Sequence, residues 1–132
     1  MSFDIKIEGR GIWHTIHTLA LYATNESLKN AFVLTMDSLA KNFACEICKP
    51  DFNKFINQHP FKNYWNLKQK NEEIGLFKWT WELHNTINQK LGKPILSFDD
   101  AYNMTKYHVC KNCNKNPILI PLEEKLNLIS YY

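Results

Sequence analysis

Apolar residues recur at spacings of three and four along most of this chain, which is the pattern of helices that bury one face. The first stretch with this pattern is residues 11–23, and the second is residues 28–43. Between them, Thr24-Asn25-Glu26 is a break that also carries the signal of a new helix start. We therefore expect two consecutive helices in the first third of the chain.

The third apolar stretch, residues 45–56, has a helical period but contains Pro50. Proline is well tolerated only in the first turn of a helix, so this helix either begins near Pro50 or is kinked there. His59-Pro60 ends the element, and the polar residues that follow, through Gly75, are expected to form a connection.

The strongest helical pattern lies in residues 76–91, where apolar residues follow each other at steps of four: Trp79, Leu83, Ile87 and Leu91. Gly92 and Pro94 then provide the stop signal. We therefore expect a helix here that ends at Gly92.

The last expected helix can be capped by Ser97 or Asp99 and ends near His108, and residues beyond Pro117 have no firm period. No segment has a convincing strand pattern. The sequence therefore predicts an all-α fold of about five helices, consistent with a bundle.

Composition fits a single packed domain that covers residues 1–132. Of the 132 residues, 45% are hydrophobic and 14% aromatic, which excludes a disordered chain. The net charge of +3 comes from lysines scattered along the sequence, whereas nucleic-acid binding needs a concentrated basic face. We therefore expect no nucleic-acid partner. No stretch resembles a secretory signal or a membrane span, so we also expect no membrane insertion.

The candidate chemistry lies in two C-x-x-C pairs, Cys45 with Cys48 and Cys110 with Cys113. In a chain without an export signal, such pairs indicate metal binding or redox chemistry. Four thiolates could hold zinc, although residues 49–109 separate the pairs, an interval longer than the ~15–20 residues of zinc ribbons. If Cys45 and Cys48 lie at a helix start, the helix dipole and Lys49 favour a reactive thiolate. Spacing alone leaves both interpretations open.

Aromatic, histidine and amide side chains recur on the first and fourth expected helices: Trp13, His17, Tyr22, Trp79, Trp81, His84, Asn85 and Asn88. Such a set suits a flat heteroaromatic ligand, which needs stacking surfaces and a few oriented polar groups. The same residues are equally compatible with an aromatic-rich core.

Three segments resemble the FAD-linked sulfhydryl oxidases of the Erv/ALR type. The stretch G-R-G-I-W-H-T-I-H-T-L-A-L-Y, Gly9–Tyr22, resembles the family's G-R-x-x-W-x-x-L-H helix. The stretch F-A-C-E-I-C, with Asp51-Phe52 behind it, is similar to the active-site C-x-x-C. The most specific segment, L-H-N-T-I-N-Q-K-L-G-K-P, Leu83–Pro94, is similar to H-N-x-V-N-x-x-L-G-K-P. Together the three segments frame most of the domain.

The resemblance implies a four-helix bundle that cradles FAD, a short fifth helix and a homodimer. The core would cover about residues 9–108, followed by a tail, residues 109–132. The positions that match family residues near the cofactor are Gly9, Arg10, Trp13, His17, Tyr22, His84, Asn85, Asn88, Lys90 and Lys93. The resemblance assigns no metal ligand.

The resemblance also implies the reaction. A protein dithiol would attack the Cys45–Cys48 disulfide at Cys45, the interchange thiol, and Cys48 would face the flavin. Electrons would pass to FAD and then to molecular oxygen, which yields hydrogen peroxide.

The chain departs from the family pattern around its cysteines. Ala44 stands where the family usually has proline, and Pro50 is an addition. The structural C-x16-C pair of many relatives is missing, and Cys110-Lys111-Asn112-Cys113 stands in the tail instead. We hypothesise that Cys110 and Cys113 form a shuttle disulfide that reaches Cys45, with a structural disulfide as the alternative.

The resemblance is greatest to the small versions encoded by large DNA viruses, which implies a location in the host cytoplasm, virus factory or virion. The mitochondrial intermembrane space is the alternative location. A four-thiolate zinc-binding helical module without enzymatic activity is the rival function, and a helical scaffold that binds neither flavin nor metal is a third possibility.

Overall fold

The computed structural model describes residues 8–43, 46 and 48–108 of the chain. Five α-helices dominate this part, as the sequence predicts: α1 (Glu8–Leu21), α2 (Glu26–Asn42), α3 (Lys49–Gln58), α4 (Gly75–Lys90) and α5 (Phe98–His108). A short 3₁₀ helix, η1 (Phe61–Asn63), follows α3. The expectation of an all-α fold is confirmed for the described residues.

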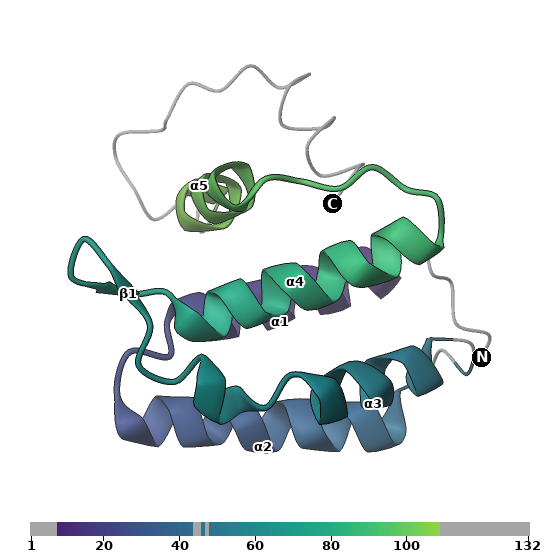
Figure 1. The fold of residues 1–132 in the computed structure, drawn as a ribbon, viewed down its shortest axis with the longest axis horizontal. Helices are drawn as coiled ribbons and strands as arrows, with labels where there is room; N and C mark the ends of the chain where they lie inside the picture. The colour runs from purple at the N-terminus through teal and green to yellow at the C-terminus, as the bar shows by residue number, and fades with distance from the viewer. Residues whose placement is uncertain (1–7, 44–45, 47, 109–132) are drawn as a thin grey trace.

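Four of the helices form a bundle of two layers (Figure 1). Helices α1 and α4 lie side by side in one layer, α2 and α3 form the other, and α5 packs over α1 and α4 at a steep angle to them. None of the helices in the described part of the chain is long and apolar enough to cross a bilayer.

The helix boundaries follow local signals. Asn25 caps α2, because its side-chain oxygen accepts a hydrogen bond from the Leu28 backbone N–H at 2.9 Å. Ser97 caps α5 in the same way through the Asp100 N–H. Pro50 lies in the first turn of α3, so this helix begins beside Pro50 and is not kinked there. The first of the two alternatives for this segment is therefore the correct one.

Helix α4 ends as Gly92 predicts. Gly92 has φ +70°, and the Lys93 N–H donates to the Asn88 carbonyl at 2.8 Å, which is the Schellman arrangement. The apolar stripe of α4 is buried at Trp79, Leu83 and Ile87. Leu91 lies beyond the last turn and is exposed.

The connection between α3 and α4 contains a small β-ribbon that the sequence did not predict. Strands β1 (Lys68–Gln69) and β2 (Glu72–Glu73) pair antiparallel, and the turn residues Lys70 and Asn71 both have positive φ. The absence of strands was therefore a wrong expectation for this segment. Two-residue strands are too short to produce the alternation that marks a strand in a sequence.

Gly75, the first residue of α4, is required by a close approach of the chain to itself. A Cβ atom at this position would lie 1.6 Å from the backbone oxygen of Tyr64. Glycine is the residue that permits such an approach. The contact fixes the start of α4 against the end of η1.

Aromatic side chains fill the centre of the bundle. Trp79 is fully buried and meets Phe32 and Phe55 edge-on, with ring centroids 6.3 and 5.4 Å apart. Its indole N–H donates to the His59 carbonyl at 2.9 Å, so its polar group is satisfied inside the core. Met36 of α2 and Phe77 of α4 are also fully buried.

Candidate functional site

One end of the bundle gathers the segments that the sequence singled out. The amino ends of α1 and α3 and the carboxyl end of α4 lie at this end (Figure 1). Lys90, in the last turn of α4, forms an ion pair with Asp51, in the first turn of α3, at 2.6 Å. Cys48 is the residue immediately before α3, so this ion pair holds the α3 start beside the end of α4.

Cys48 occupies the N-cap position of α3 and takes part in a disulfide. The other three cysteines, Cys45, Cys110 and Cys113, lie outside the described residues. The start of α3 is anchored on a second side, because the Asn53 amide donates to the Ala40 carbonyl of α2 at 2.9 Å. A cysteine at a helix N-terminus is one whose thiolate form the helix dipole stabilises.

Trp13 and His17 of α1 lie against His84 of α4. The Trp13 and His84 rings are parallel within 3°, with centroids 3.9 Å apart. His17 Nε2 lies 2.8 Å from His84 Nδ1, and both histidines are buried. The sequence analysis named these three residues within a larger set of eight, and the structure brings the three together.

Thr80 fixes the proton positions in this cluster. Its hydroxyl lies 2.7 Å from the Phe77 carbonyl, which can only accept, so the hydroxyl donates its one proton there. The Thr80 oxygen then accepts from His17 Nδ1 at 2.8 Å. A neutral His17 therefore accepts at Nε2 from the Nδ1–H of His84, which leaves His84 Nε2 as an acceptor.

Burial keeps both imidazoles neutral. Desolvation, together with the nearby His14, lowers the pKa of His17 from 6.5 to about 3. Desolvation also lowers the pKa of His84 well below 6.5, with contributions from His17 and Lys93. The sequence analysis missed Thr80, although its position one turn before His84 on an otherwise aromatic stripe is a signal that could have found it.

Asn88 is a buried residue of this region with an unsatisfied hydrogen-bond donor. It is 3% exposed, and its side-chain nitrogen has no hydrogen-bond partner among the described residues. It lies one turn after His84 on α4. Because a buried amide nitrogen without a partner is costly, a polar ligand beside the Trp13–His84 stack would satisfy it. The cluster thus fits a planar cofactor with hydrogen-bond acceptors.

The other residues assigned to the cofactor occupy varied positions. Gly9 is buried in the first turn of α1, and Arg10 and Lys93 are exposed. The Asn85 amide is engaged with the backbone of Leu96, which it contacts both as donor and as acceptor. Tyr22 lies beyond the carboxyl end of α1 and is half-exposed, outside the Trp13–His84 cluster.

Trp81 supports the segment that follows α4 and does not join the cluster. Its indole N–H donates to the Leu96 carbonyl at 2.8 Å. Trp79 is a core residue, as the alternative interpretation of the aromatic residues expected. Among the described residues, no three His, Cys, Asp or Glu side chains are arranged to hold a metal ion.

Comparison with known proteins gives a consistent result. The Erv1 / Alr family matches residues 10–108. A mitochondrial FAD-linked sulfhydryl oxidase ERV1 of Saccharomyces cerevisiae is 27% identical over 94 residues, which cover 69% of this chain and 46% of the yeast protein. The FAD-linked sulfhydryl oxidase ERV1 of Arabidopsis thaliana is 28% identical over 91 residues, 66% of this chain and 44% of the plant protein.

A viral relative matches over a larger share of its own length. An FAD-linked sulfhydryl oxidase of African swine fever virus is 23% identical over 106 residues, 78% of this chain and 83% of the viral protein. No solved structure has a significant match to the chain. The chain spans less than half the length of the yeast and plant relatives. Because the family match covers most of the bundle, the chain belongs to the Erv1 / Alr family.

Proposed function

We propose that this protein is an FAD-linked sulfhydryl oxidase that forms disulfides in protein substrates. One observation carries the proposal: the disulfide-bonded Cys48 stands at the start of α3, at the end of the bundle that also holds the Trp13–His84 stack and the unpartnered amide of Asn88. A redox-active cysteine and side chains suited to hold a planar cofactor are the two parts that such an enzyme needs. The relatives named as FAD-linked sulfhydryl oxidases support the same function.

The reaction begins with thiol–disulfide exchange. A thiolate of the substrate dithiol, or of a shuttle pair that the substrate has reduced, attacks the sulfur of Cys45 and breaks the Cys45–Cys48 bond, and Cys48 leaves as a thiolate at the positive end of α3. The second substrate thiol then attacks the mixed disulfide and releases Cys45. The substrate loses two electrons and two protons, and the Cys45–Cys48 pair becomes a dithiol.

The family residues would hold FAD in the cluster of α1 and α4. Trp13 and His84 supply flat surfaces, and the Asn88 amide supplies the donor that lacks a partner within the described chain. Thr80 and His17 set the orientation of the His84 ring through the contacts of its Nδ1. The chemistry that FAD supplies when bound is two-electron transfer from the cysteine pair to molecular oxygen, with hydrogen peroxide as the product.

The test is a visible absorption spectrum of the purified protein with a metal assay on the same sample. We expect a flavin spectrum, no stoichiometric zinc, and peroxide production from a small dithiol such as dithiothreitol. Cys45→Ser should retain the flavin and lose peroxide production. A colourless, folded protein that holds zinc would contradict the proposal and support the four-thiolate module.

We further propose that Cys110 and Cys113 shuttle electrons from substrate proteins to Cys45. Both residues lie outside the described part of the chain, and their C-x-x-C spacing is the support for this role. The double variant Cys110→Ser/Cys113→Ser should lose oxidation of a protein dithiol and keep oxidation of dithiothreitol. If wild type and the double variant oxidise the protein dithiol at equal rates, Cys110 and Cys113 form a structural disulfide and not a shuttle.

We propose the site of virus assembly in the host cytoplasm, or the virion itself, as the location. The viral relative supports this choice, because this chain covers 83% of it and only 46% of the mitochondrial yeast protein. We also propose that the protein is a homodimer. Its support is the outer face of α2, where Leu34 is 70% exposed and borders a shallow hollow of about 460 Å³.

A further inference from the structure

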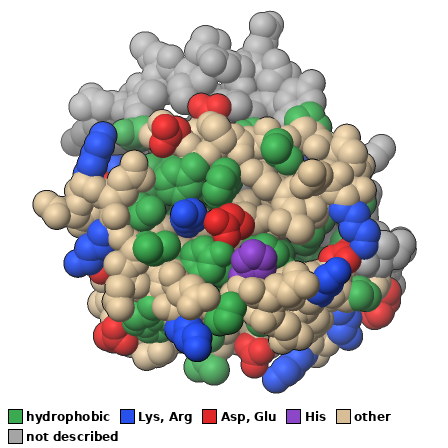
Figure 2. Space-filling model, viewed as in Figure 1, with side chains coloured by type: hydrophobic (Ala, Val, Ile, Leu, Met, Phe, Trp, Pro, Cys, Tyr) green, Lys and Arg blue, Asp and Glu red, His purple; other side chains and the backbone are tan. Residues whose placement is uncertain are grey.

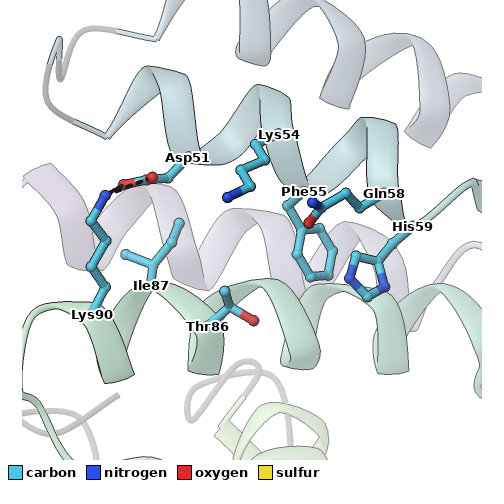
Figure 3. A pocket seen from close by; sticks show the side chains of 8 residues that line it. All are labelled: Asp51, Lys54, Phe55, Gln58, His59, Thr86, Ile87 and Lys90. Carbon is cyan, nitrogen blue, oxygen red and sulfur yellow. Dashed lines mark hydrogen bonds and ion pairs between the residues drawn. The ribbon is translucent and has the colours of Figure 1, made fainter.

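A groove of about 320 Å³ lies between α3 and α4, on the side of α3 that faces Thr86 (Figure 3). Phe55 and Ile87 form its apolar floor, one from each helix. The Asp51–Lys90 ion pair closes the end near the start of α3, as the dashed lines in Figure 3 show. The groove is partly open to solvent.

The groove carries one uncompensated positive charge. Lys54 extends into the space between the two helices (Figure 3), and it has no ion-pair or hydrogen-bond partner among the described residues. Lys90 is neutralised by Asp51. Electrostatics in the groove therefore favour an acidic group at Lys54.

Hydrogen-bonding groups remain available at the other end. Gln58 lines the groove together with Phe55 (Figure 3), and its amide has no partner among the described residues. Tyr64 donates its proton to the Glu82 carboxylate, and burial with this contact raises the pKa of the Tyr64 hydroxyl. His59 Nδ1 must then donate to the Tyr64 oxygen, 3.2 Å away, which leaves its Nε2 as an acceptor.

The surface around the groove is a mosaic of apolar and charged side chains. Figure 2 shows apolar side chains at the surface across the middle of the face that α3 and α4 form, with most lysine and arginine side chains nearer the rim. Nucleic acid requires several cations along a continuous track, whereas this groove has two lysines, of which Lys90 is paired with Asp51. The groove combines an apolar floor, the Lys54 ammonium, and the hydrogen-bonding groups of Gln58 and His59. These features suit a short polypeptide segment.

The groove begins beside the proposed catalytic disulfide. Asp51 and Lys54 follow Cys48 by three and six residues, so the groove starts within one turn of this cysteine and continues along α3 to His59. A polypeptide with its thiols at the Cys45–Cys48 pair would lay its neighbouring residues along this line.

We propose that the α3–α4 groove binds the segment that flanks the thiol pair of the protein substrate, and that it selects an apolar residue next to an acidic one. The apolar side chain rests on Phe55 and Ile87, the acidic side chain pairs with Lys54, and Gln58 with His59 contacts the peptide backbone. This inference rests on the proposed oxidase function, because it assigns that enzyme's substrate preference.

Two peptides that contain Cys-x-x-Cys test the groove, one flanked by Leu-Glu and one by Leu-Lys. Oxidation rates with the full-length protein give kcat/KM, and fluorescence anisotropy of labelled peptides with serine in place of cysteine gives binding without any redox step. Wild type should favour the acidic peptide in both measurements. Lys54→Glu should lower the affinity and the kcat/KM for the acidic peptide by about 3- to 10-fold, because it removes one attraction and adds a repulsion. The same variant should raise the affinity for the basic peptide.

Lys62→Glu is the matched control. Lys62 is exposed on η1, has no described ion pair and does not line the groove, so the ratio between the two peptides should stay within about twofold of wild type. Lys54→Met provides a neutral second variant, which should weaken the acidic peptide and leave the basic one unchanged. All variants should oxidise dithiothreitol at the wild-type rate.

Different results would disprove substrate selection by the groove and the oxidase function itself. If wild type oxidises dithiothreitol and neither Lys54 variant changes the acidic-to-basic ratio, the groove does not select the substrate. A ratio that Lys62→Glu changes as much as Lys54→Glu would also overturn it, since net charge alone would then explain the preference. A protein without flavin or dithiol oxidation disproves the oxidase function, whatever the peptides do.

Discussion

The hydroxyl of Thr80 orders the two buried histidines between α1 and α4. It donates to the Phe77 carbonyl and accepts from His17, and this direction sets the tautomers of His17 and His84. The side chains of Thr80, His17 and His84 are all buried. A buried donor that loses its acceptor is penalised by its full desolvation cost. Loss of the Thr80 hydroxyl oxygen should therefore destabilise this region.

Thr80→Val removes that oxygen and keeps the shape of the side chain. We expect a loss of about 1–3 kcal/mol in the free energy of unfolding, because the His17 Nδ1–H is left buried without an acceptor. Thr86→Val is the control, since Thr86 is exposed on the same helix and also donates to a backbone carbonyl four residues earlier. Urea denaturation measures both variants, and equal losses would contradict the role of Thr80.

Stability should decline in acid through the two histidines. The folded-state pKa of His17, about 3, lies below the unfolded value of 6.5, and that of His84 is lowered as well. Below about pH 6.5 the unfolded chain therefore binds more protons than the folded one. The contribution of His17 is complete above that pH and is lost by about 1.4 kcal/mol per pH unit as the pH decreases towards about 3, and His84 adds a loss in the same direction.

The variant His17→Gln isolates this effect. Glutamine does not titrate, so the difference in unfolding free energy between wild type and variant should shrink as the pH falls below about 6.5. Urea titrations across this range provide the measurement. A difference that stays constant with pH would show that His17 is not held neutral in the folded protein.

At the scale of elements, a partly buried ion pair connects α2 to the β-ribbon. Lys29 is 5% exposed, and its ammonium donates to both the Trp65 carbonyl and the Glu73 carboxylate at 2.8 Å. The ribbon is held to α5 as well, because the Tyr102 hydroxyl and Lys106 both contact Glu72. Contacts with α2 and α5 therefore stabilise the short ribbon more than its own strand pairing does.

Lys29→Met should lower the unfolding free energy by about 2–3 kcal/mol, since it leaves a carboxylate and a carbonyl without their main partner in a poorly solvated place. Lys41→Met tests the same change on the same helix, where the pair with Asp37 is exposed and should contribute less than about 0.5 kcal/mol. Thermal or urea unfolding compares them. Similar losses in the two variants would mean that burial does not strengthen the Lys29 contacts.

For the whole molecule, the antiparallel arrangement of α3 and α4 places Cys48 at the end of the bundle that carries His84 and Asn88. The Asp51–Lys90 pair maintains this placement, and α5 covers α1 and α4 from the side. The outer face of α2 has no helix packed on it within the described chain and exposes Leu34. Burial of this face between two copies is the contact that the homodimer proposal requires.

Leu34→Glu should convert the protein from a dimer to a monomer in sedimentation velocity, because it places a charge in an apolar contact. Ile95→Glu is the control, as Ile95 is 61% exposed and lies between α4 and α5, away from α2. Wild type that sediments as a monomer would disprove the dimer. Dissociation by Ile95→Glu in equal measure would place the interface elsewhere.

Much of the fold was predictable because helices and their caps are local. Asn25 caps α2 through a residue three positions away, and Gly92 ends α4 through its own positive φ. The cluster of Trp13, His17 and His84 was also predictable, from its residue types and from the family resemblance. The β-ribbon was not, since its strands are too short to have a period.

The sequence by itself determined the helices of the described chain and most of their capping residues, because each depends on residues within one or two turns. Tertiary structure alone decided the partners of the buried polar groups. Lys90 meets Asp51 across 39 residues, Lys29 meets Glu73 across 44, and His17 meets Thr80 across 63. Such contacts depend on which helix faces which, and that choice is made by the burial of the whole core rather than by any local pattern.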